Sequence, residues 1–402
     1  MNRLKKAYCR TYQTVFKLAL PFLPYRTPEV VGSVKKLPEI ILREKCANVL
    51  IITDKQIMNL GLTRRLEKAL TDSGIPYTLY DGTVANPTTA NVADALALYQ
   101  ENGCDAIIGF GGGSSMDCAK AVGARAVKPK QSLAQMKGIL KVHKKLPLLM
   151  AVPTTAGTGS ETTLAAVITD VETRHKYAIN DFPLIPRYAV LDPKVTLSLP
   201  PFVTATTGMD ALTHAVEAYV STDANPLTDA AAIKAIDKIV HYLPQAVANG
   251  DYMKARSEMA YAQYLAGVAF NNASLGYVHA MAHQLGGYYN LPHGVCNAIL
   301  LPYVQEFNLI GNLERFAVIA KAMDLNVDGM SPFEAGEACV YGLKTFGRYL
   351  GIPQNLRSLG GDPADFEVMA ENAMKDACAA TNPRKATKDQ IIAIFQKAYD
   401  GD

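Results

Sequence analysis

The chain has 402 residues, of which 49% are hydrophobic and 19% charged, and its formal net charge is +3. At about 150 residues per domain, this length predicts two or three compact domains and excludes a disordered or fibrous chain. So small a net charge does not create the positive field that nucleic-acid binding needs, so nucleic acid is not an expected partner. The seven cysteines are widely spaced without a C-x-x-C pair, which favours a reducing cytoplasmic compartment over a disulfide framework.

Residues 1–26 form an N-terminal extension in which apolar and basic side chains separate with helical periodicity. Lys17 and Pro21 interrupt its apolar run, and no segment of the chain approaches the roughly 18 to 20 apolar residues that cross a bilayer, so we expect neither export nor a membrane span. The pattern predicts a basic amphipathic helix over residues 1–22. This helix packs on the body of the protein or on another subunit, or it docks onto a membrane surface or a larger assembly.

Residues 27–199 alternate short apolar runs with helical patterns, such as Gly61–Ser73 and Asn91–Asn102 between the first three predicted strands. Strands that alternate with helices predict an α/β domain with a Rossmann-like parallel sheet that is covered by helices on both faces. From residue 200 to 402 the Ala-rich and Leu-rich segments predict a second, all-α domain, with the boundary near Asp192–Pro201. The predicted strands are Asn48–Thr53, Tyr77–Asp81, Asp105–Phe110, Leu148–Val152 and Tyr188–Leu191.

The glycine-rich segment Gly109–Asp117 follows the third predicted strand and opens a helical pattern. Glycines at the end of a strand allow the backbone to approach a ligand, and the free N–H groups at the start of the next helix attract phosphate. We therefore predict a pyrophosphate site here. The segment is not a G-x-G-x-x-G fingerprint, so a tight turn without a ligand is the alternative interpretation.

Two further features favour a dinucleotide. Thr154–Ser160 is a loop of hydroxyls and glycines after the fourth predicted strand, at the sheet edge where open α/β sheets bind ligands. Asp54, after the first predicted strand, is placed to accept hydrogen bonds from an adenosine ribose, and its charge would repel a 2′-phosphate. This favours NAD over NADP. The alternative role of Asp54 is to cap the helix that follows.

The second half of the chain carries carboxylate and imidazole groups at helical spacing. Asp210 and His214 lie four residues apart, as do His279 and His283, and His293 follows a short turn. Each pair alone has an ordinary explanation as a surface hydrogen bond. Together, Asp210, His214, His279 and His293 can enclose one divalent ion such as iron, zinc, cobalt or nickel. The H-E-x-x-H signature of zinc metalloproteases is absent.

Four segments carry a family resemblance: GGGSSMDCAK from Gly111, PTTAGTGSE from Pro153, GMDALTHAVEAY from Gly208 and GYVHAMAHQLGGYYNLPHG from Gly276. In these segments, and from about Pro28 to the carboxyl end, the chain resembles the iron-dependent (group III) alcohol dehydrogenases. The resemblance implies a dehydroquinate synthase-like nucleotide domain, a helical domain and an active site between them. It implies the metal ligands Asp210, His214, His279 and His293. The expected cofactor-binding residues are Asp54, Asn86, Gly112, Gly113, Ser114, Asp117, Thr154, Thr155, Thr158 and Lys176.

The expected reaction is reversible hydride transfer between a nicotinamide and a short to medium primary alcohol or aldehyde. The expected cofactors are NAD, with NADP less favoured, and Fe²⁺, for which Zn²⁺ is a possible substitute. The resemblance places His283 near the substrate as a proton relay or positioning residue, and orientation of a metal ligand is its alternative role. A glycerol or other polyol dehydrogenase, a dehydroquinate synthase-type lyase and a non-catalytic scaffold are the alternative functions. We also expect a homo-oligomer.

Overall fold

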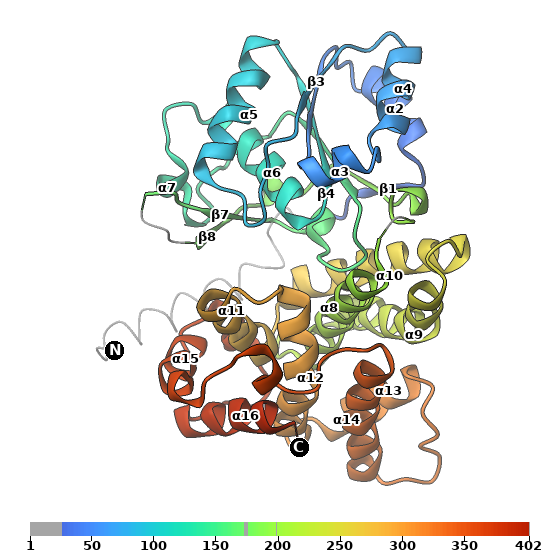
Figure 1. Ribbon diagram of the computed structural model, residues 1–402, viewed down its shortest axis with the longest axis vertical. Helices are drawn as coiled ribbons and strands as arrows, with labels where there is room; N and C mark the ends of the chain where they lie inside the picture. Colours follow the sequence, from blue (N-terminus) through green and yellow to red (C-terminus); the bar gives the residue numbers. More distant parts are fainter. Residues whose placement is uncertain (1–25, 173–175, 198, 402) are drawn as a thin grey trace.

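The computed structural model describes residues 26–172, 176–197 and 199–401. The predicted helix over residues 1–22 lies outside these ranges. An α/β part precedes a helical part in the chain, and the two are stacked along the longest axis of the molecule (Figure 1). None of the described helices is both long enough and apolar enough to cross a bilayer.

The central sheet has six parallel strands in the order β1-β9-β6-β4-β2-β3. All five predicted strands are confirmed, each to within one residue at either end. The edge strand β1 was not predicted, because three residues are too few to show a pattern. The strands are β1 (Glu29–Val31), β2 (Val49–Ile52), β3 (Tyr77–Tyr80), β4 (Ala106–Gly111), β6 (Leu148–Pro153) and β9 (Tyr188–Val190).

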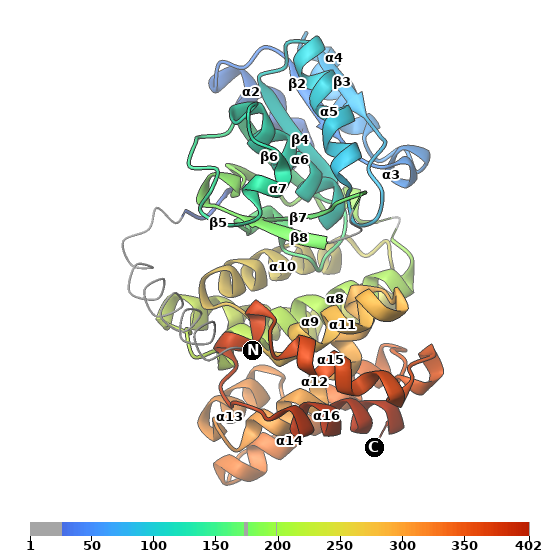
Figure 2. The same cartoon turned by 90° about the vertical axis from the view of Figure 1, so that its left-hand side faces the viewer.

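Helices cover both faces of this sheet, as Figure 2 shows. In β2, Leu50 and Ile52 belong to the apolar cluster under α5 (Thr89–Glu101) and α6 (Gly113–Val127). The alternate residues, Val49 and Ile51, belong to the cluster on the other face, which also contains residues of α2 (Leu37–Arg43) and α4 (Arg64–Asp72). Burial on both faces explains why the strand is a continuous apolar run.

A second, three-stranded sheet in the order β5-β8-β7 was not predicted. It contains β5 (Gly138–Ile139), β7 (Ala165–Thr169) and β8 (Lys176–Asn180). β7 and β8 form an antiparallel pair, and in both strands buried positions alternate with half-buried or exposed ones. Such mixed strands lack the continuous apolar run that marked the other strands. Lys176, one of the predicted cofactor-binding residues, is the first residue of β8 in this sheet.

The strand order reverses between β2 and β4. The chain passes from β2 to its neighbour β3 on one side, and from β4 to its neighbour β6 on the other. Ligands of open α/β sheets bind at such a switch point, beyond the carboxyl ends of the strands. Asp54 lies two residues after the end of β2, and the segment Gly111–Gly113 begins at the last residue of β4, so both lie at the switch point.

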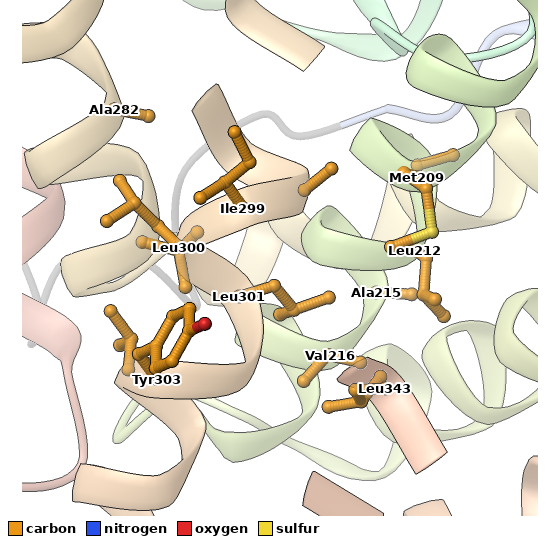
Figure 3. Close-up of a cluster of buried hydrophobic side chains, with 14 of the residues drawn as sticks. Met209, Leu212, Ala215, Val216, Ala282, Ile299, Leu300, Leu301, Tyr303 and Leu343 are labelled. Carbon is orange, nitrogen blue, oxygen red and sulfur yellow. The ribbon is translucent and has the colours of Figure 1, made fainter. Parts of the chain in front are cut away.

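Among the described residues after 200 there are helices and no strands, as predicted for the all-α part. Its core combines Met209, Leu212 and Val216 with Leu300 and Leu301 of another helix (Figure 3). The helices are α8 (Pro201–Val220), α9 (Pro226–Ala248), α10 (Met253–Ala273), α11 (Tyr277–Tyr289), α12 (His293–Leu309), α13 (Leu313–Ala322), α14 (Pro332–Tyr349), α15 (Phe366–Ala373) and α16 (Lys388–Asp400).

Helix α10 joins the two parts of the molecule. A Cβ atom on Gly267 would lie 2.3 Å from Oγ1 of Thr162, in the short 3-10 helix η3 (Ser160–Thr162). Tyr264 of the same helix donates a hydrogen bond of 2.9 Å to the carbonyl of Pro28. The loop after β6 is therefore packed directly on the helical part.

Candidate active site

The glycine-rich turn after β4 forms the N-terminus of α6. Gly112 precedes this 15-residue helix and supplies no side-chain cap, so the first N–H groups have no partner from that residue. Gly111 has a φ of 151°, and a Cβ there would lie 2.5 Å from Oγ of Ser115. The backbone conformation therefore requires glycine, and the turn presents N–H groups in the arrangement that binds phosphate.

Thr155 and Thr158 lie opposite this turn. The Cγ2 atom of Thr155 is 3.8 Å from the Cβ position of Gly112, and that of Thr158 is 3.4 Å from the Cβ position of Gly113. Thr155 Oγ1 is buried and has no hydrogen-bond partner among the described residues. A buried hydroxyl without a partner is costly, so its position fits a bound polar group such as a dinucleotide. Thr154, also predicted here, is buried.

Asn86, Ser114 and Lys176 come together from three segments of the chain. The backbone N–H of Asn86 donates to Ser114 Oγ at 3.2 Å, and Lys176 Nζ donates to Asn86 Oδ1 at 2.7 Å. Asn86 has a φ of 58°, in the left-handed region that asparagine tolerates. Three predicted cofactor-binding residues thus lie beside the N-terminus of α6.

Asp54 caps the helix that follows it. Its Oδ1 accepts from the backbone N–H of Ile57 at 2.9 Å, at the start of α3 (Lys55–Asn59), and its Oδ2 accepts from Ser115 Oγ at 3.4 Å. The capping role is therefore present. The carboxylate also lies at the switch point of the sheet, and a cap does not prevent it from accepting further hydrogen bonds.

Asp117, also predicted to bind the cofactor, accepts hydrogen bonds from two protein groups. Its Oδ1 accepts from Ser160 Oγ at 2.8 Å and its Oδ2 from the backbone N–H of Val167 at 3.0 Å. Both oxygens are thus engaged by protein groups. Asp117 is the fifth residue of α6. Its contacts connect α6 to the loop after β6 and to β7.

Asp210, His214, His279 and His293 converge as their spacing predicted. Each offers one ligand atom, and these four atoms lie within 4.8 Å of one another. Asp210 Oδ1 is 3.9 Å from His279 Nε2 and 3.6 Å from His293 Nε2. Asp210 and His214 lie on α8, His279 lies on α11 and His293 begins α12. Three imidazoles and one carboxylate fit a divalent iron or zinc ion.

Ring packing holds two of the imidazoles. The His214 ring lies between Phe270, with centroids 4.3 Å apart, and His279, with centroids 4.6 Å apart. Burial is the main cause that lowers the pKa of His214, and it lowers the pKa of His279 well below the ordinary value. A lowered pKa favours the neutral imidazole, which is the form that binds a metal.

Two polar residues of this site were missing from the predicted set. Glu217, one turn beyond His214 on α8, has Oε2 at 2.6 Å from His279 Nδ1 and accepts the backbone N–H of Val278 at 2.7 Å. Asn297 Nδ2 lies 2.7 Å from Asp210 Oδ1 and 3.1 Å from Nε2 of His279. Their signal was available, since each is a polar residue on the same helical face as a predicted ligand. The amide of Asn297 is not a usual ligand for iron or zinc, and Glu217, although a carboxylate like Asp210, was not selected.

His283 lies beside the cluster. Its ring stacks on His293 with centroids 5.7 Å apart, and its side chain is 42% exposed. Its Nδ1 lies 2.9 Å from Oδ2 of Asp376, a residue that sequence reasoning did not select. Cys296, in contrast, is fully buried in the core of the helical part, as expected.

The loop after β6 reaches the helix that carries two of the four clustered residues. A Cβ on Gly157 would lie 2.4 Å from the carbonyl oxygen of Thr207 on α8, and one on Gly294 would lie 2.5 Å from that of Thr206. Thr206 and Thr207 precede Asp210 by about one turn. The hydroxyl-rich loop and the His/Asp cluster are therefore adjacent, although they belong to different parts of the fold.

Comparison with known proteins agrees with this arrangement. A family model described as iron-containing alcohol dehydrogenase matches residues 28–193, and one described as Fe-containing alcohol dehydrogenase family, C-terminal, matches residues 204–399. The chain is 45% identical over 387 residues to 1,3-propanediol dehydrogenase of Klebsiella pneumoniae, covering 96% of this chain and 99% of that protein. It is 40% identical over 377 residues to NAD-dependent methanol dehydrogenase of Bacillus methanolicus, covering 94% and 99%. The structure of an alcohol dehydrogenase from Oenococcus oeni matches with a TM-score of 0.90 and 44% identity, covering 93% of this chain and 100% of that one.

The fold and the site together define a metal-dependent oxidoreductase that interconverts alcohols and aldehydes with a nicotinamide cofactor. The chain belongs to the iron-containing alcohol dehydrogenase family. The predicted family, fold class and class of reaction are thereby confirmed.

Proposed function

We propose that Asp210, His214, His279 and His293 hold one divalent metal ion, iron or zinc, at the site of hydride transfer. The observation that carries this proposal is the convergence of their four ligand atoms within 4.8 Å. The ion, when bound, supplies Lewis-acid chemistry that stabilises negative charge on the substrate oxygen. The protein contributes neutral imidazoles and one carboxylate, so the loaded site keeps a positive charge.

We propose that the N-terminus of α6 and the opposing threonine loop bind the pyrophosphate of NAD. Gly112, Gly113 and Ser114 contribute from the helix side, and Thr155 and Thr158 contribute from the loop. The unpartnered Thr155 hydroxyl supports a bound polar group here. Adjacency of this loop to α8 then brings the nicotinamide end toward the His/Asp cluster.

In the alcohol-oxidising direction, a C–H bond of the carbinol carbon breaks and its hydride moves to C4 of the nicotinamide. The hydroxyl proton leaves, and the product is an aldehyde and NADH. We assign this proton to His283, the imidazole that lies next to the cluster and is open to solvent. In the reverse direction His283 returns the proton to the oxygen of the reduced aldehyde.

The proposed substrates are short linear alcohols and aldehydes, including small diols. A relative that shares 45% of its residues with this chain is named for 1,3-propanediol, and one that shares 40% is named for methanol. This keeps the polyol alternative open. The proposed compartment is the cytoplasm and the proposed state is a homo-oligomer. Light scattering of the full chain, and of a chain without residues 1–22, tests the second of these.

The test of the metal site compares two histidine variants. In His279→Ala, we expect loss of bound iron or zinc and loss of aldehyde-dependent NADH oxidation. His241→Ala is the control, because His241 is an exposed residue of α9 whose Nδ1 contacts the carbonyl of Asp237. The control should keep both metal and activity. Full turnover by metal-free His279→Ala protein would contradict the proposed function.

The preference for NAD is tested by Asp54→Asn. Asparagine caps helices as well as aspartate does, so this change keeps the contact with Ile57 and removes the charge. We expect NADPH-dependent activity to rise relative to NADH-dependent activity, because the repulsion of a 2′-phosphate is lost. An unchanged ratio of the two activities would show that Asp54 acts only as a helix cap.

A further inference from the structure

His283 and Asp376 form a pair that joins two distant parts of the helical domain. The Nδ1 atom of His283, on α11, lies 2.9 Å from Oδ2 of Asp376, which is 93 residues further along the chain. The Asp376 side chain is only 18% exposed, whereas that of His283 is 42% exposed. The carboxylate is therefore the fixed member of the pair, and the imidazole is the member that solvent or a substrate can reach.

The orientation of Asp376 is set by its other oxygen. Oδ1 accepts the backbone N–H of Cys378 at 2.9 Å, and Asp376 is thereby the N-cap of the 3-10 helix η8 (Ala377–Thr381). The two carboxylate oxygens thus have different partners. An ionised carboxylate has no hydrogen to donate, so the hydrogen between Asp376 and His283 must belong to Nδ1 of the imidazole.

We propose that Asp376 is a positioning residue that holds His283 in the tautomer with hydrogen on Nδ1. In that tautomer Nε2 carries a lone pair and is the nitrogen that can accept the proton of an alcohol. This inference rests on the proposed role of His283 in proton transfer. The same logic operates wherever a carboxylate fixes the tautomer of a histidine that acts as a base.

A metal ion bound by the same residues is the competing interpretation. His283, Asp376 and Cys378 offer ligand atoms within 4.8 Å of one another. In the observed geometry, however, His283 Nδ1 and Asp376 Oδ2 are directed at one another at hydrogen-bond distance, so both atoms are already engaged. The pair therefore favours a hydrogen bond over a second ion, and the experiment below distinguishes the two.

Asp376→Asn is the sharpest test, because the backbone predicts which way the amide turns. The N–H of Cys378 needs an acceptor, so the amide oxygen takes the place of Oδ1 and the NH₂ group faces His283. This forces the opposite tautomer on the imidazole. Asp376→Ala removes the carboxylate without imposing either tautomer, so it is the matched comparison.

The direct readout is the tautomer of His283 in histidine-labelled, zinc-loaded protein by nitrogen NMR, with His283→Ala used to assign the signal. We expect hydrogen on Nδ1 in the unmodified protein and on Nε2 in Asp376→Asn. In steady-state assays with NADH and an aldehyde, we expect kcat to fall by about 100-fold in Asp376→Asn and by less in Asp376→Ala, with KM for NADH unchanged. Asp365→Asn, which alters a carboxylate that accepts from Tyr289, should change neither readout.

The outcomes separate this inference from the proposed function. An unchanged tautomer in Asp376→Asn would overturn the positioning role. A changed tautomer with full activity would support positioning and would remove His283 from the proposed reaction. The double variant Asp376→Asn/His283→Ala should be no slower than His283→Ala alone, because Asp376 acts through the imidazole. Titration with Co²⁺ should saturate at one ion per chain without a thiolate charge-transfer band. Two ions with such a band, lost in Cys378→Ala, would establish the metal interpretation instead.

Discussion

Glu217 Oε2 lies 2.6 Å from His279 Nδ1, and both side chains are almost completely buried. This contact leaves Nε2 as the His279 nitrogen that lies toward Asp210, at 3.9 Å from its Oδ1. One helix, α8, therefore carries two of the four clustered residues and also the carboxylate that orients a third. Such carboxylate–histidine contacts fix the ring orientation of a metal ligand and raise its basicity.

We expect Glu217→Gln to lower the affinity for iron or zinc by about 10- to 100-fold. One oxygen of the Glu217 carboxylate accepts the N–H of Val278 and the other contacts His279 Nδ1. The amide of glutamine has a single oxygen, so it cannot accept a hydrogen bond at both places. Competition with a chelator of known affinity measures this. Glu306→Gln is the control, since Glu306 pairs with Lys397 on the surface. Equal metal affinities in the Glu217→Gln variant and the unmodified protein would contradict the orienting role.

The next prediction concerns Asn297 and the stability of the metal-free protein. Its Nδ2 lies within 3.1 Å of Asp210, His279 and His293. A lone pair that accepts a hydrogen bond cannot bind a metal at the same time, so these contacts stabilise the metal-free state. In Asn297→Ala we expect the chelator-treated protein to lose about 1–3 kcal/mol of stability and the zinc-loaded protein to lose less. The rise in Tm on adding zinc should therefore exceed that of the unmodified protein, and a smaller rise would refute the argument.

The shifted pKa values of the buried residues Glu161 and Lys120 lead us to expect that the free energy of unfolding depends on pH. Burial raises the pKa of Glu161 to about 7 and lowers the pKa of Lys120 to about 8. Between its ordinary pKa and about 7, Glu161 keeps a proton in the folded state that the unfolded state releases, so its contribution to stability falls as pH rises. Glu161→Gln should remove this decline. The slopes of the unfolding free energy against pH should then differ between the two proteins by at most about 1.4 kcal/mol per pH unit. Urea midpoints at pH 5 and pH 7 check this, and a constant difference between the two proteins would count against it.

For Lys120 the sign is opposite. Its buried ammonium binds a proton less tightly in the folded state than in the unfolded state, so its contribution to stability rises with pH above about 8. Its Nζ donates to Ser160, Thr163 and the carbonyl of Ala165, so the charge is compensated by hydrogen bonds near the nucleotide loop. Between pH 8 and pH 10 we expect the urea midpoint of Lys120→Met to rise less, or to fall more, than that of the unmodified protein. Equal changes of the midpoint in the two proteins over that range would contradict the assignment.

Gly267 tests the junction between the two parts of the molecule. Because a Cβ there would lie 2.3 Å from Thr162 Oγ1 and 3.2 Å from Gly159, we expect Gly267→Ala to destabilise the protein by about 1–3 kcal/mol. Gly287→Ala is the matched control, since Gly287 is also helical and has no atom within 4 Å of its Cβ position. There alanine should be neutral or stabilising, because it favours helix. Equal urea midpoints for the two variants would show that the junction is not tightly packed.

The strands and the four clustered residues could be predicted because their signals are local. A strand buried on both faces is a continuous apolar run, as in Val49–Ile52, and two residues four apart on a helix share a face, as Asp210 and His214 do. β1 and the pair β7 and β8 gave no such signal, because one is three residues long and the others alternate between buried and half-buried positions.

The sequence by itself thus determined the order of strands and helices, the glycine-rich turn and the residue types that converge on a metal. Only the tertiary structure decided which groups orient them: Glu217 meets His279 across 62 residues and Asp376 meets His283 across 93. It also decided that Asp117 accepts hydrogen bonds from Ser160 and from the backbone of Val167. The physical reason is that spacing along a helix specifies a shared face, whereas a hydrogen bond between helices depends on how they pack, which no local pattern records.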